Sequence, residues 1–574
     1  MDKDTSTILS RNRVLLIPAL AGSILTLILA WSVSEWLVYK VNADMKAHIR
    51  FQAVQLSQAV DAELVRGLTF TIEDEGNPAF ERIRRQFRSY GELAGLHGIY
   101  TLALRDGMVV FGPSTRDARN LDTVPAGTVY DNPSPSFFDV FEKGSIVIEV
   151  SPDGRNGFIS AVAPVFDSRS GPASLAVGID MKIDDWMCLK TKARFLPLAA
   201  GLLIILLIAG GTALLWWRWK FRAAGNIPFR HTETVMVALI SLVLAVSSVA
   251  VILADEHRDR ARIFLRSADA MAEAVIATFR GVRDDTAAIA RFKAGSRHVE
   301  ISEFSVFAGP LAETSAVQAY MLISTVPLQE RKSFESTVSE EGLAGFEIWE
   351  FNEAGLKVSA SDRPFYYPVR CVEPLPGNAS YLGFDLGSEP ILRNAVEEAR
   401  GDGLMAVTDR VDITVNGQDR PGLLLLDPVF LPAGNEPQAA PEIFNNLRGF
   451  SLAAIRLDTI LEAALRGHVD EGIPAVTTLL DGRSQNQPET LAIHPAKYGE
   501  GGYLTEETGL KKQYLTVIHP LFSFGHPFAI FSRPTDEFFA MHPLRATPLA
   551  GAAGAALTVL LTSLVFSLRN RSVT

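Results

Sequence analysis

The stretch GFDLGSEPILRNAVEEARGDG, residues 383–403, combines glycines, a serine and a helix start, the residue types that build phosphate-binding loops. Closely spaced glycines let backbone amides approach a phosphate, and a helix N-terminus attracts its negative charge. The spacing matches neither G-x-G-x-x-G nor G-x-x-x-x-G-K-[ST], because Glu389 follows Ser388 and the stretch contains no lysine. An acidic residue at that place repels phosphate, so the stretch favours a structural role.

The same stretch predicts a short strand, a tight turn and an amphipathic helix. Phe384 and Leu386 alternate as on a strand, while Ser388 suits the N-cap of a helix. Pro390 suits the first helical turn, and Gly401 suits the helix end. The residues at core spacing are Leu392, Ala395, Val396 and Ala399, and those on the solvated side are Arg393, Glu397 and Arg400. We therefore predict a capped helix packed on a sheet.

Histidine spacing gives no metal site, and no motif of a nucleotide-dependent transferase occurs. No H-E-x-x-H or paired-ligand spacing is present. A kinase needs a phosphoacceptor histidine and glycine-rich nucleotide boxes, and a diguanylate cyclase needs a Gly-Gly-[Asp/Glu]-Glu-Phe turn, but the sequence has neither. The histidines that precede proline, which favours extended backbone, are His494, His519, His526 and His542. We expect no catalytic residue, no metal and no cofactor.

Composition points to a membrane protein. Of 574 residues, 48% are hydrophobic, which is high for a soluble chain. A spanning helix needs about 20 apolar residues. The stretches that meet this length are 14–33, 195–217, 234–254 and 549–568. The first is too long for the apolar part of a signal peptide and lacks a clear cleavage site, so we predict an uncleaved anchor.

Basic residues set the predicted orientation. They cluster in segments 1–13, 218–233 and 569–574, which we therefore expect to be cytoplasmic, with both chain termini inside. The segments 34–194 and 255–548 are then exported. A net charge of −11 without a basic face excludes nucleic acid as a partner. The two cysteines, Cys188 and Cys371, are expected to be unpaired.

Each exported segment begins with a helical pattern and continues with short strands. Apolar residues recur three and four positions apart along both helices, and the second helix is predicted over about 255–292. The recurring residues are Ile49, Ala53, Leu56, Val60, Leu64 and Leu68, then Phe264, Ala268, Met271, Val275, Phe279 and Val282. The first segment continues with a hairpin over 98–112 that turns at Asp106-Gly107, and with strands over 145–150, 157–165 and 173–181.

This order in the first segment resembles a PAS-like sensor domain of the Cache type. The resemblance covers about 38–186. Its pieces are Ile99-Tyr100-Thr101, Arg105-Asp106-Gly107, residues 125–130, Ala163-Pro164-Val165 and Gly178-Ile179-Asp180.

The second segment resembles the CHASE domain, the extracellular sensory domain found ahead of histidine kinases and nucleotide cyclases. The match runs over roughly 304–465, in the order Glu330-Arg331, Phe334-Glu335, Gly345-Phe346, Tyr367-Pro368-Val369, residues 383–403, Thr408, residues 427–430, residues 447–450 and Arg456. The resemblance implies a long helix with two PAS-like lobes, of which the membrane-proximal one covers Gly449 to about 538. Residues 383–403 would form a wall of the membrane-distal ligand lobe.

The resemblance also implies a set of ligand-contacting residues. In the plant cytokinin-receptor members of the family, an acidic residue before the Pro-Val strand binds the adenine ring, and Asp362 is the nearest acid upstream of Pro368. The ligand candidates are Asp362, Tyr366, Tyr367, Val369, Asp385 and Thr408. Strand packing for the tyrosines, capping of the turn for Asp385 and strand preference for Thr408 are the structural alternatives.

We therefore predict an α+β membrane protein with four transmembrane helices and two exported modules, each a long helix followed by a PAS-like antiparallel sheet. The resemblance implies a sensor in a bacterial inner membrane that binds a small molecule, relays the signal across the lipid bilayer and is not an enzyme. A homodimer through the long helices and a separate cytoplasmic kinase or cyclase are the expected partners. The alternative is the sensory half of a histidine kinase or diguanylate cyclase whose transferase domain is missing.

Overall fold

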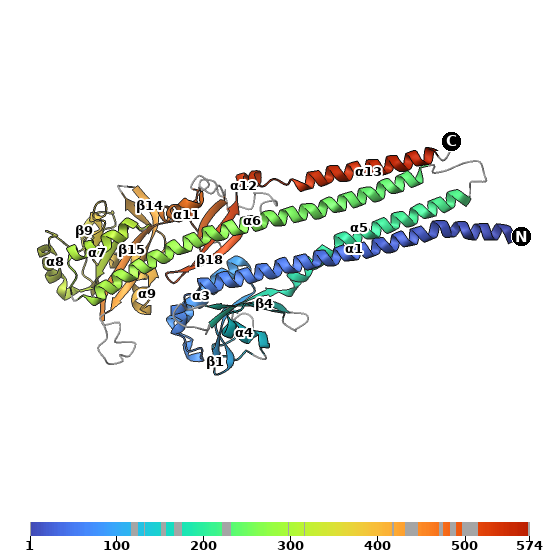
Figure 1. The fold of residues 1–574 in the computed structure, drawn as a ribbon. Coiled ribbons are helices and arrows are strands. Elements are labelled where there is room, and N and C mark those ends of the chain that lie inside the picture. Colours follow the sequence, from blue (N-terminus) through green and yellow to red (C-terminus); the bar gives the residue numbers. More distant parts are fainter. Residues whose placement is uncertain are drawn as a thin grey trace.

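The computed structural model has a stalk of long helices at one end and three sheets at the other (Figure 1). It describes residues 2–115, 124–130, 133–150, 157–165, 175–220, 231–296, 298–314, 316–415, 418–430, 446–469, 475–482, 489–495 and 515–571.

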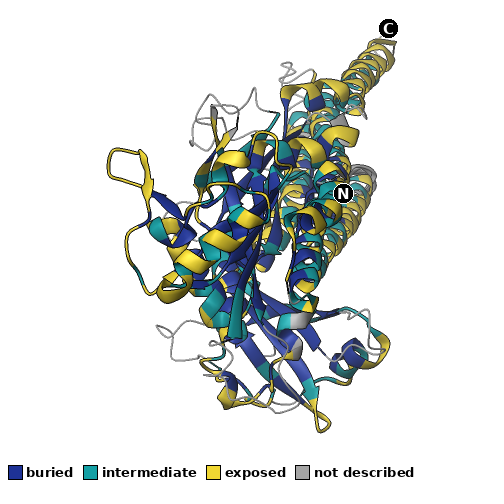
Figure 2. Cartoon of the chain, turned by 90° about the vertical axis from the view of Figure 1, so that its left-hand side faces the viewer, coloured by how far each residue is buried: buried dark blue, intermediate teal, exposed yellow. Residues whose placement is uncertain are grey.

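Four long helices lie side by side, and both chain termini are at the same end of the stalk (Figure 1). Helix α1 packs on α5, α5 on α6, and α6 on α13. All four are long and apolar enough to cross a membrane, and their apolar side chains there are largely exposed (Figure 2). Their bounds are Asp2–Ala59, Ile183–Lys220, Thr232–Gly295 and Ala546–Arg571, so each predicted span lies inside one helix.

The first sheet has five antiparallel strands in the order β2-β1-β5-β4-β3. The predicted hairpin turn is present, with left-handed φ of 50° at Asp106 and 76° at Gly107. Ile49, Ala53 and Leu56 of α1 are buried in the core on this sheet, as their spacing predicted. The elements are α2 (Ala62–Arg66), η1 (Ile72–Asp74), α3 (Pro78–Ala94), β1 (Gly98–Arg105), β2 (Met108–Ser114), α4 (Pro135–Lys143), β3 (Val147–Val150), β4 (Phe158–Val165) and β5 (Leu175–Lys182).

The second sheet has the order β11-β6-β15-β14-β12, with β13 also paired to β14. Smaller pairings join β10 to β7 and β8 to β9 beside it. The elements are α7 (Ile301–Thr314), β6 (Ala319–Ser324), β7 (Val326–Pro327), η3 (Leu328–Glu330), α8 (Arg331–Glu340), β8 (Trp349–Phe351), β9 (Lys357–Ser359), β10 (Phe365–Tyr366), β11 (Val369–Glu373), η4 (Ala379–Tyr381), η5 (Leu386–Ser388), α9 (Pro390–Asp402), β12 (Ala406–Val407), β13 (Val411–Val415), β14 (Gln418–Phe430) and β15 (Leu447–Arg456).

The third sheet, with the order β17-β16-β19-β18, lies nearer the stalk than the second (Figure 1). Gly449, predicted to open the lobe near the membrane, instead lies in β15 of the second sheet, because β15 pairs with β6 and β14. The elements are α11 (Leu457–Val469), β16 (Ala475–Asp481), β17 (Glu489–His494), β18 (Val517–Ser523), β19 (His526–Pro534) and α12 (Asp536–Met541).

All three sheets follow one topology. In each, the first long strand pairs with the second on one side and with the last on the other, and the last pairs with the strand before it. This places the sequence-distant first and last strands at the centre of each sheet. The predicted pattern of a helix followed by an antiparallel sheet therefore occurs three times, once in the N-terminal part and twice in the second.

Helix α6 is the common support of the second and third sheets. Phe264, Met271 and Phe279 lie in one core with residues of both sheets, such as Tyr320 and Phe528. This corrects the prediction that the apolar seam of this helix joins two copies of the chain. Met271 is 5% exposed and Val275 is fully buried, so neither can meet a second molecule. The apolar pattern of α6 extends over many turns because this one helix packs against two sheets.

Gly449 allows α6 to approach the second sheet, which generates a prediction. Its φ is 138°, and a Cβ there would overlap the Ile323 carbonyl oxygen and lie 2.7 Å from Lys293 Nζ. Gly449→Ala should lower the free energy of unfolding by about 2–4 kcal/mol, measured by thermal or denaturant unfolding of the solubilised chain. Gly467→Ala is the matched control, because Gly467 lies in α11 with no atom near its missing Cβ. It should change stability by at most about 1 kcal/mol, towards greater stability. An equal change in the free energy of unfolding for the two variants would contradict the close contact of α6 with the second sheet at Gly449.

Candidate functional site

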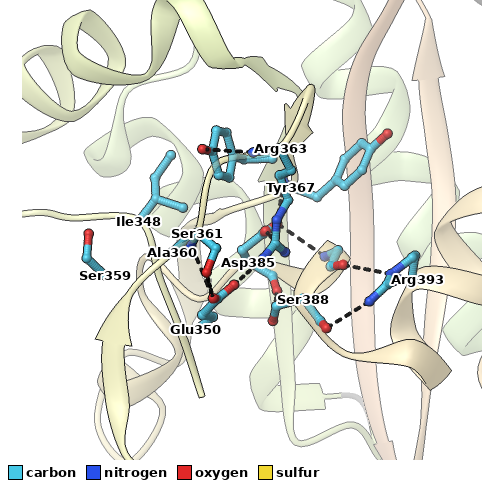
Figure 3. Close-up of polar contacts among 12 residues, drawn as sticks. Ile348, Glu350, Ser359, Ala360, Ser361, Arg363, Tyr367, Asp385, Ser388 and Arg393 are labelled. Carbon is cyan, nitrogen blue, oxygen red and sulfur yellow. Dashed lines mark hydrogen bonds and ion pairs between the residues drawn. The ribbon is translucent and has the colours of Figure 1, made fainter. Parts of the chain in front are cut away.

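Two of the predicted ligand residues, Tyr367 and Asp385, lie close together on the face of the second sheet that α9 covers, the outer face (Figure 3). Strand β6 explains why this sheet has two covered faces. Tyr320 and Leu322 point into the core with α6, while Met321 and Ile323 point into the core with α9. The loops between β7 and α9 are therefore held against a rigid, fully packed sheet.

Asp385 is the centre of a buried polar network (Figure 3). Its side chain is fully buried, and its carboxylate accepts hydrogen bonds from the Tyr367 N–H at 2.6 Å and the Gly387 N–H at 3.1 Å. The Arg363 guanidinium donates a third bond, at 2.8 Å. Burial raises the pKa of Asp385, and the Tyr367 N–H, Arg363 and the Gly387 N–H offset this only in part. The network therefore joins two chain segments that run over the same face of the sheet.

Arg363 bridges Asp385 to a second acid, Glu350 of β8. Glu350 also accepts from the Ser361 N–H at 3.1 Å and from the Ser361 hydroxyl at 2.6 Å. Burial opposes the ionisation of Glu350, but the bonds from Ser361 and Arg363 outweigh it and lower its pKa. One guanidinium between two carboxylates leaves this cluster with a net negative charge.

Tyr366 lies beside this network and contacts a second arginine. The Arg331 guanidinium is 5.1 Å from the ring centroid of Tyr366, whose side chain is fully buried. Arg331 also donates to the Ala360 and Ile348 carbonyl oxygens, at 2.7 and 2.9 Å, and pairs with Glu335 at 3.0 Å. Arg331 thereby fixes α8 to the loops that carry the candidates.

The other candidates have different surroundings. Asp362 is exposed next to Arg363, and Val369 is buried in β11. Thr408 is buried just after β12. Its hydroxyl accepts a hydrogen bond from the Leu424 N–H at 3.0 Å and so extends the pairing of β12 with β14. The structure thus brings Tyr367 and Asp385 into direct contact. Tyr366 and Val369 are close to Tyr367 in the chain, whereas Thr408 bonds to Leu424 of β14.

Sequence analysis did not select Arg363, Arg331 or Glu350 as site residues. Arg331 and Glu335 were noted only as parts of a motif series. The sequence did contain a hint for Arg363, which stands just before the Pro-Phe-Tyr-Tyr-Pro run. A charge next to such an apolar segment is costly to bury unless it is paired.

Helix α9 confirms part of the prediction for residues 383–403. Leu392, Ala395, Val396 and Ala399 are buried, as expected. The N-cap is Glu389 rather than Ser388, because the Ser388 hydroxyl instead donates to the Asp385 carbonyl oxygen at 2.6 Å. The helix ends at Asp402, with Gly403 rather than Gly401 in the left-handed capping position. The predicted strand is absent: Phe384 and Asp385 make isolated bridges, and a 3-10 turn follows over Leu386–Ser388, with Asp385 as its cap.

A comparison with known families covers the segment that carries the network. Residues 297–492 match the CHASE domain. The match contains α7, the second sheet, α11 and the first strands of the third sheet. It confirms the resemblance found in the sequence and supports a sensory role for this part of the chain. No curated protein sequence matches the chain.

Several solved sensory domains align with parts of the chain at low identity. An extracellular ligand-binding receptor from Desulfohalobium retbaense is 12% identical over 47% of this chain and 40% of its own length, with a TM-score of 0.31. The periplasmic sensory domain of the Campylobacter jejuni chemoreceptor Tlp1 is 9% identical over 50% of this chain and 98% of its own, with a TM-score of 0.29. The ligand-binding domain of Campylobacter jejuni Tlp3 in complex with L-valine is 12% identical over 28% and 63%, with a TM-score of 0.20.

Polar contacts join the second sheet to α6 on the face opposite the Asp385 network. The Ser451 hydroxyl donates to the Thr286 carbonyl oxygen at 2.9 Å, and the Tyr320 hydroxyl donates to Asp285 at 2.9 Å. Lys293 Nζ donates to the Ile323 carbonyl oxygen at 2.5 Å, and burial lowers the pKa of Lys293 to about 7. These bonds join the central strands β6 and β15 directly to α6.

The network predicts different consequences for Asp385, which belongs to it, and for Asp362, which does not. Asp385→Ala should lower the free energy of unfolding by about 3–5 kcal/mol, because it removes one of the two acids paired with the Arg363 guanidinium and leaves two backbone N–H groups without their acceptor. Asp362→Asn, at an exposed position next to Arg363, should change stability by less than about 0.5 kcal/mol. Chemical unfolding of the two variants measures both values. A small effect at Asp385 would mean that the network does not hold the loops.

Proposed function

We propose that this chain is a membrane sensor whose CHASE domain binds a small molecule on the outer face of the second sheet. The observation that carries the proposal is the single helix α6, which runs without a break from an apolar stretch to the second sheet. A ligand that moves this sheet would therefore move a helix that continues into the lipid bilayer. Relaying a signal requires such an element with two positions, and a rigid helix is suited to it.

The proposed orientation places both sheet-bearing parts on the outside. The sheets lie at one end of the stalk and both termini at the other, which suits an exported sensor with cytoplasmic ends in a bacterial inner membrane (Figure 1). The basic residues of 218–233 support the same orientation. The N-terminal part, with its helix and five-stranded sheet, is proposed as a second sensor module of PAS-like, Cache type.

The proposed ligand is a small molecule with an apolar or aromatic body and one or two polar groups. Tyr366 and Tyr367 are buried, so an aromatic contact with either ring would require the loops between β7 and α9 to open, whereas Asp362 offers an exposed carboxylate at the surface. Asp385, Val369 and Thr408 remain in the proposed set, but their side chains also hold the fold. Among the six, Asp362 and the Tyr367 hydroxyl can be changed with least effect on packing, because among the described residues that hydroxyl has one hydrogen bond, from Arg400 at 3.4 Å.

The partners proposed are a second copy of the chain and a cytoplasmic kinase or cyclase. The seam of α6 is unavailable to a second copy, so a homodimer would form through another face of the helices. The exposed apolar faces of the four long helices lie where lipid or another helix would cover them (Figure 2).

A melting-temperature screen tests the sensory function. The full chain in detergent or nanodiscs should melt at a higher temperature with at least one compound from a panel of amino acids, purines, carboxylates and amines. A ligand that binds only the folded state adds RT ln(1 + [L]/Kd), or about 2.7 kcal/mol at a hundredfold excess over Kd. Asp362→Asn or Tyr367→Phe should reduce this rise and leave the unliganded melting temperature nearly unchanged.

The matched control is Glu353→Gln, an exposed acid in the turn between β8 and β9. It should leave both the unliganded melting temperature and the ligand-induced rise unchanged. If the rise survives both site variants in full, the ligand binds elsewhere. If no compound class changes the melting temperature, the sensory proposal for this face loses its support.

A further inference from the structure

A buried arginine lies where three parts of the chain meet. Arg82 of α3 belongs to the N-terminal module, yet its side chain is only 2% exposed, because it reaches into the CHASE domain. On one side is the C-terminal end of α9, and on the other is the turn between β18 and β19, at Phe524-Gly525. Both turn residues have left-handed φ, 58° and 78°. A Cβ on Gly525 would lie 2.6 Å from the Arg82 guanidinium carbon.

The Arg82 guanidinium binds the C-terminal end of α9. Nη1 donates to the Met405 carbonyl oxygen at 2.7 Å, and Nη2 donates to Asp402 at 3.2 Å. Glu398 lies 3.6 Å from Nη2 and also faces Arg85, at 3.7 Å. A planar fork is suited to hold a carbonyl oxygen and a carboxylate at once, and the C-terminus of a helix attracts a cation.

The rest of this interface holds α3 against the third sheet. The Tyr90 hydroxyl donates to the Ile518 carbonyl oxygen at 3.3 Å, and Ser89 donates to the Gly482 carbonyl oxygen. Phe522 contacts the rings of Phe87 and Tyr90, with centroids 6.2 and 6.1 Å away. Nearer the stalk, Gln55 of α1 donates to Asp269 of α6 at 2.7 Å. The N-terminal module is therefore packed on the third sheet, while Arg82, with Arg85 beside it, reaches α9 on the second sheet.

Burying a guanidinium is costly unless its partners are fixed. Desolvation lowers the pKa of Arg82, and Glu398 and Asp402 counter it. The Nε of Arg82 has no hydrogen-bond partner among the described residues. Such an arginine favours one position of its acceptors strongly over any other, because a small displacement leaves a buried charge unpaired. Helix α9 is also the element whose first turn follows Asp385 and the network.

We propose that Arg82 couples the two modules, so that the N-terminal module sets the position of α9 and thereby regulates the candidate site of the CHASE domain. A displacement of α3 releases Asp402 and the Met405 carbonyl oxygen and loosens α9, and a displacement of α9 is felt in α3 by the same contacts. Coupling of this kind is reciprocal. Its regulatory meaning rests on the proposed function, whereas the coupling itself does not.

Hydrogen exchange on the full chain in nanodiscs, without any ligand, tests the coupling. Arg82→Gln should speed exchange in peptides covering 395–408 by at least about tenfold. Asp402→Asn should speed exchange in α3, on the other side of the interface, in the reciprocal direction. The double variant should be less affected than the product of the two single effects, because both remove one interaction.

Arg84→Gln is the matched control, since Arg84 lies on the same helix and its ion pair among the described residues is with Glu81 of α3, at 2.8 Å. It should leave peptides 395–408 unchanged. If Arg82→Gln exposes amides throughout the chain, Arg82→Lys, which keeps the charge without the fork, should give a smaller change confined to the same peptides. Unchanged exchange of α9 in Arg82→Gln, unchanged exchange of α3 in Asp402→Asn, or an equal effect of Arg84→Gln would each overturn the coupling. Because no ligand is used, a failed melting screen leaves this result intact.

Discussion

The burial of one face of α6 is the constraint on which the other parts depend. Phe264, Met271, Phe279 and Ile289 repeat along the helix and are covered by two different sheets, so the helix cannot turn or slide without exposing apolar surface under both. Because the same helix carries a long apolar stretch, the sheets are fixed relative to that stretch. The hydrogen bonds of Ser451, Tyr320 and Lys293 add directional contacts to this apolar packing. They tie the two central strands of the second sheet to particular turns of the helix.

Buried charge is used in this molecule to hold loops and modules in register. Arg363 lies between two acids, Arg331 between a glutamate and backbone carbonyls, and Arg82 between a helix end and a turn. Each of these arginines joins segments that the hydrophobic cores alone would not align, because apolar contacts are not directional. The outer face of the second sheet therefore has loops of well-defined position, as a selective binding face requires.

The sequence predicted the local elements well and the long-range contacts poorly. The length of the apolar stretches located the four apolar helices, the Asp106-Gly107 pair located the hairpin, and periodicity located the buried face of α9, because all three depend on residues close together in the sequence. The role of the α6 seam was mistaken, because Met271 and Val275 have the same pattern whether a sheet or a second helix covers them. Arg363 and Arg82 were missed because their partners are distant in the sequence. The N-cap of α9 was displaced by one residue, since the Ser388 hydroxyl donates to the Asp385 carbonyl oxygen, and the C-terminal cap is Gly403 rather than Gly401.

The account requires that α6 be one continuous rod from the apolar stretch to the sheets. Spin labels at Val246 and Ala277, both exposed and thirty-one residues apart on α6, measure this by pulsed electron resonance on the full chain in nanodiscs. A continuous helix predicts a single narrow distance distribution near 46 Å, from a rise of about 1.5 Å per residue, apart from the reach of the labels. A broad distribution, or a main distance below about 35 Å, would mean that the helix breaks between membrane and sensor, and the proposed relay would be wrong.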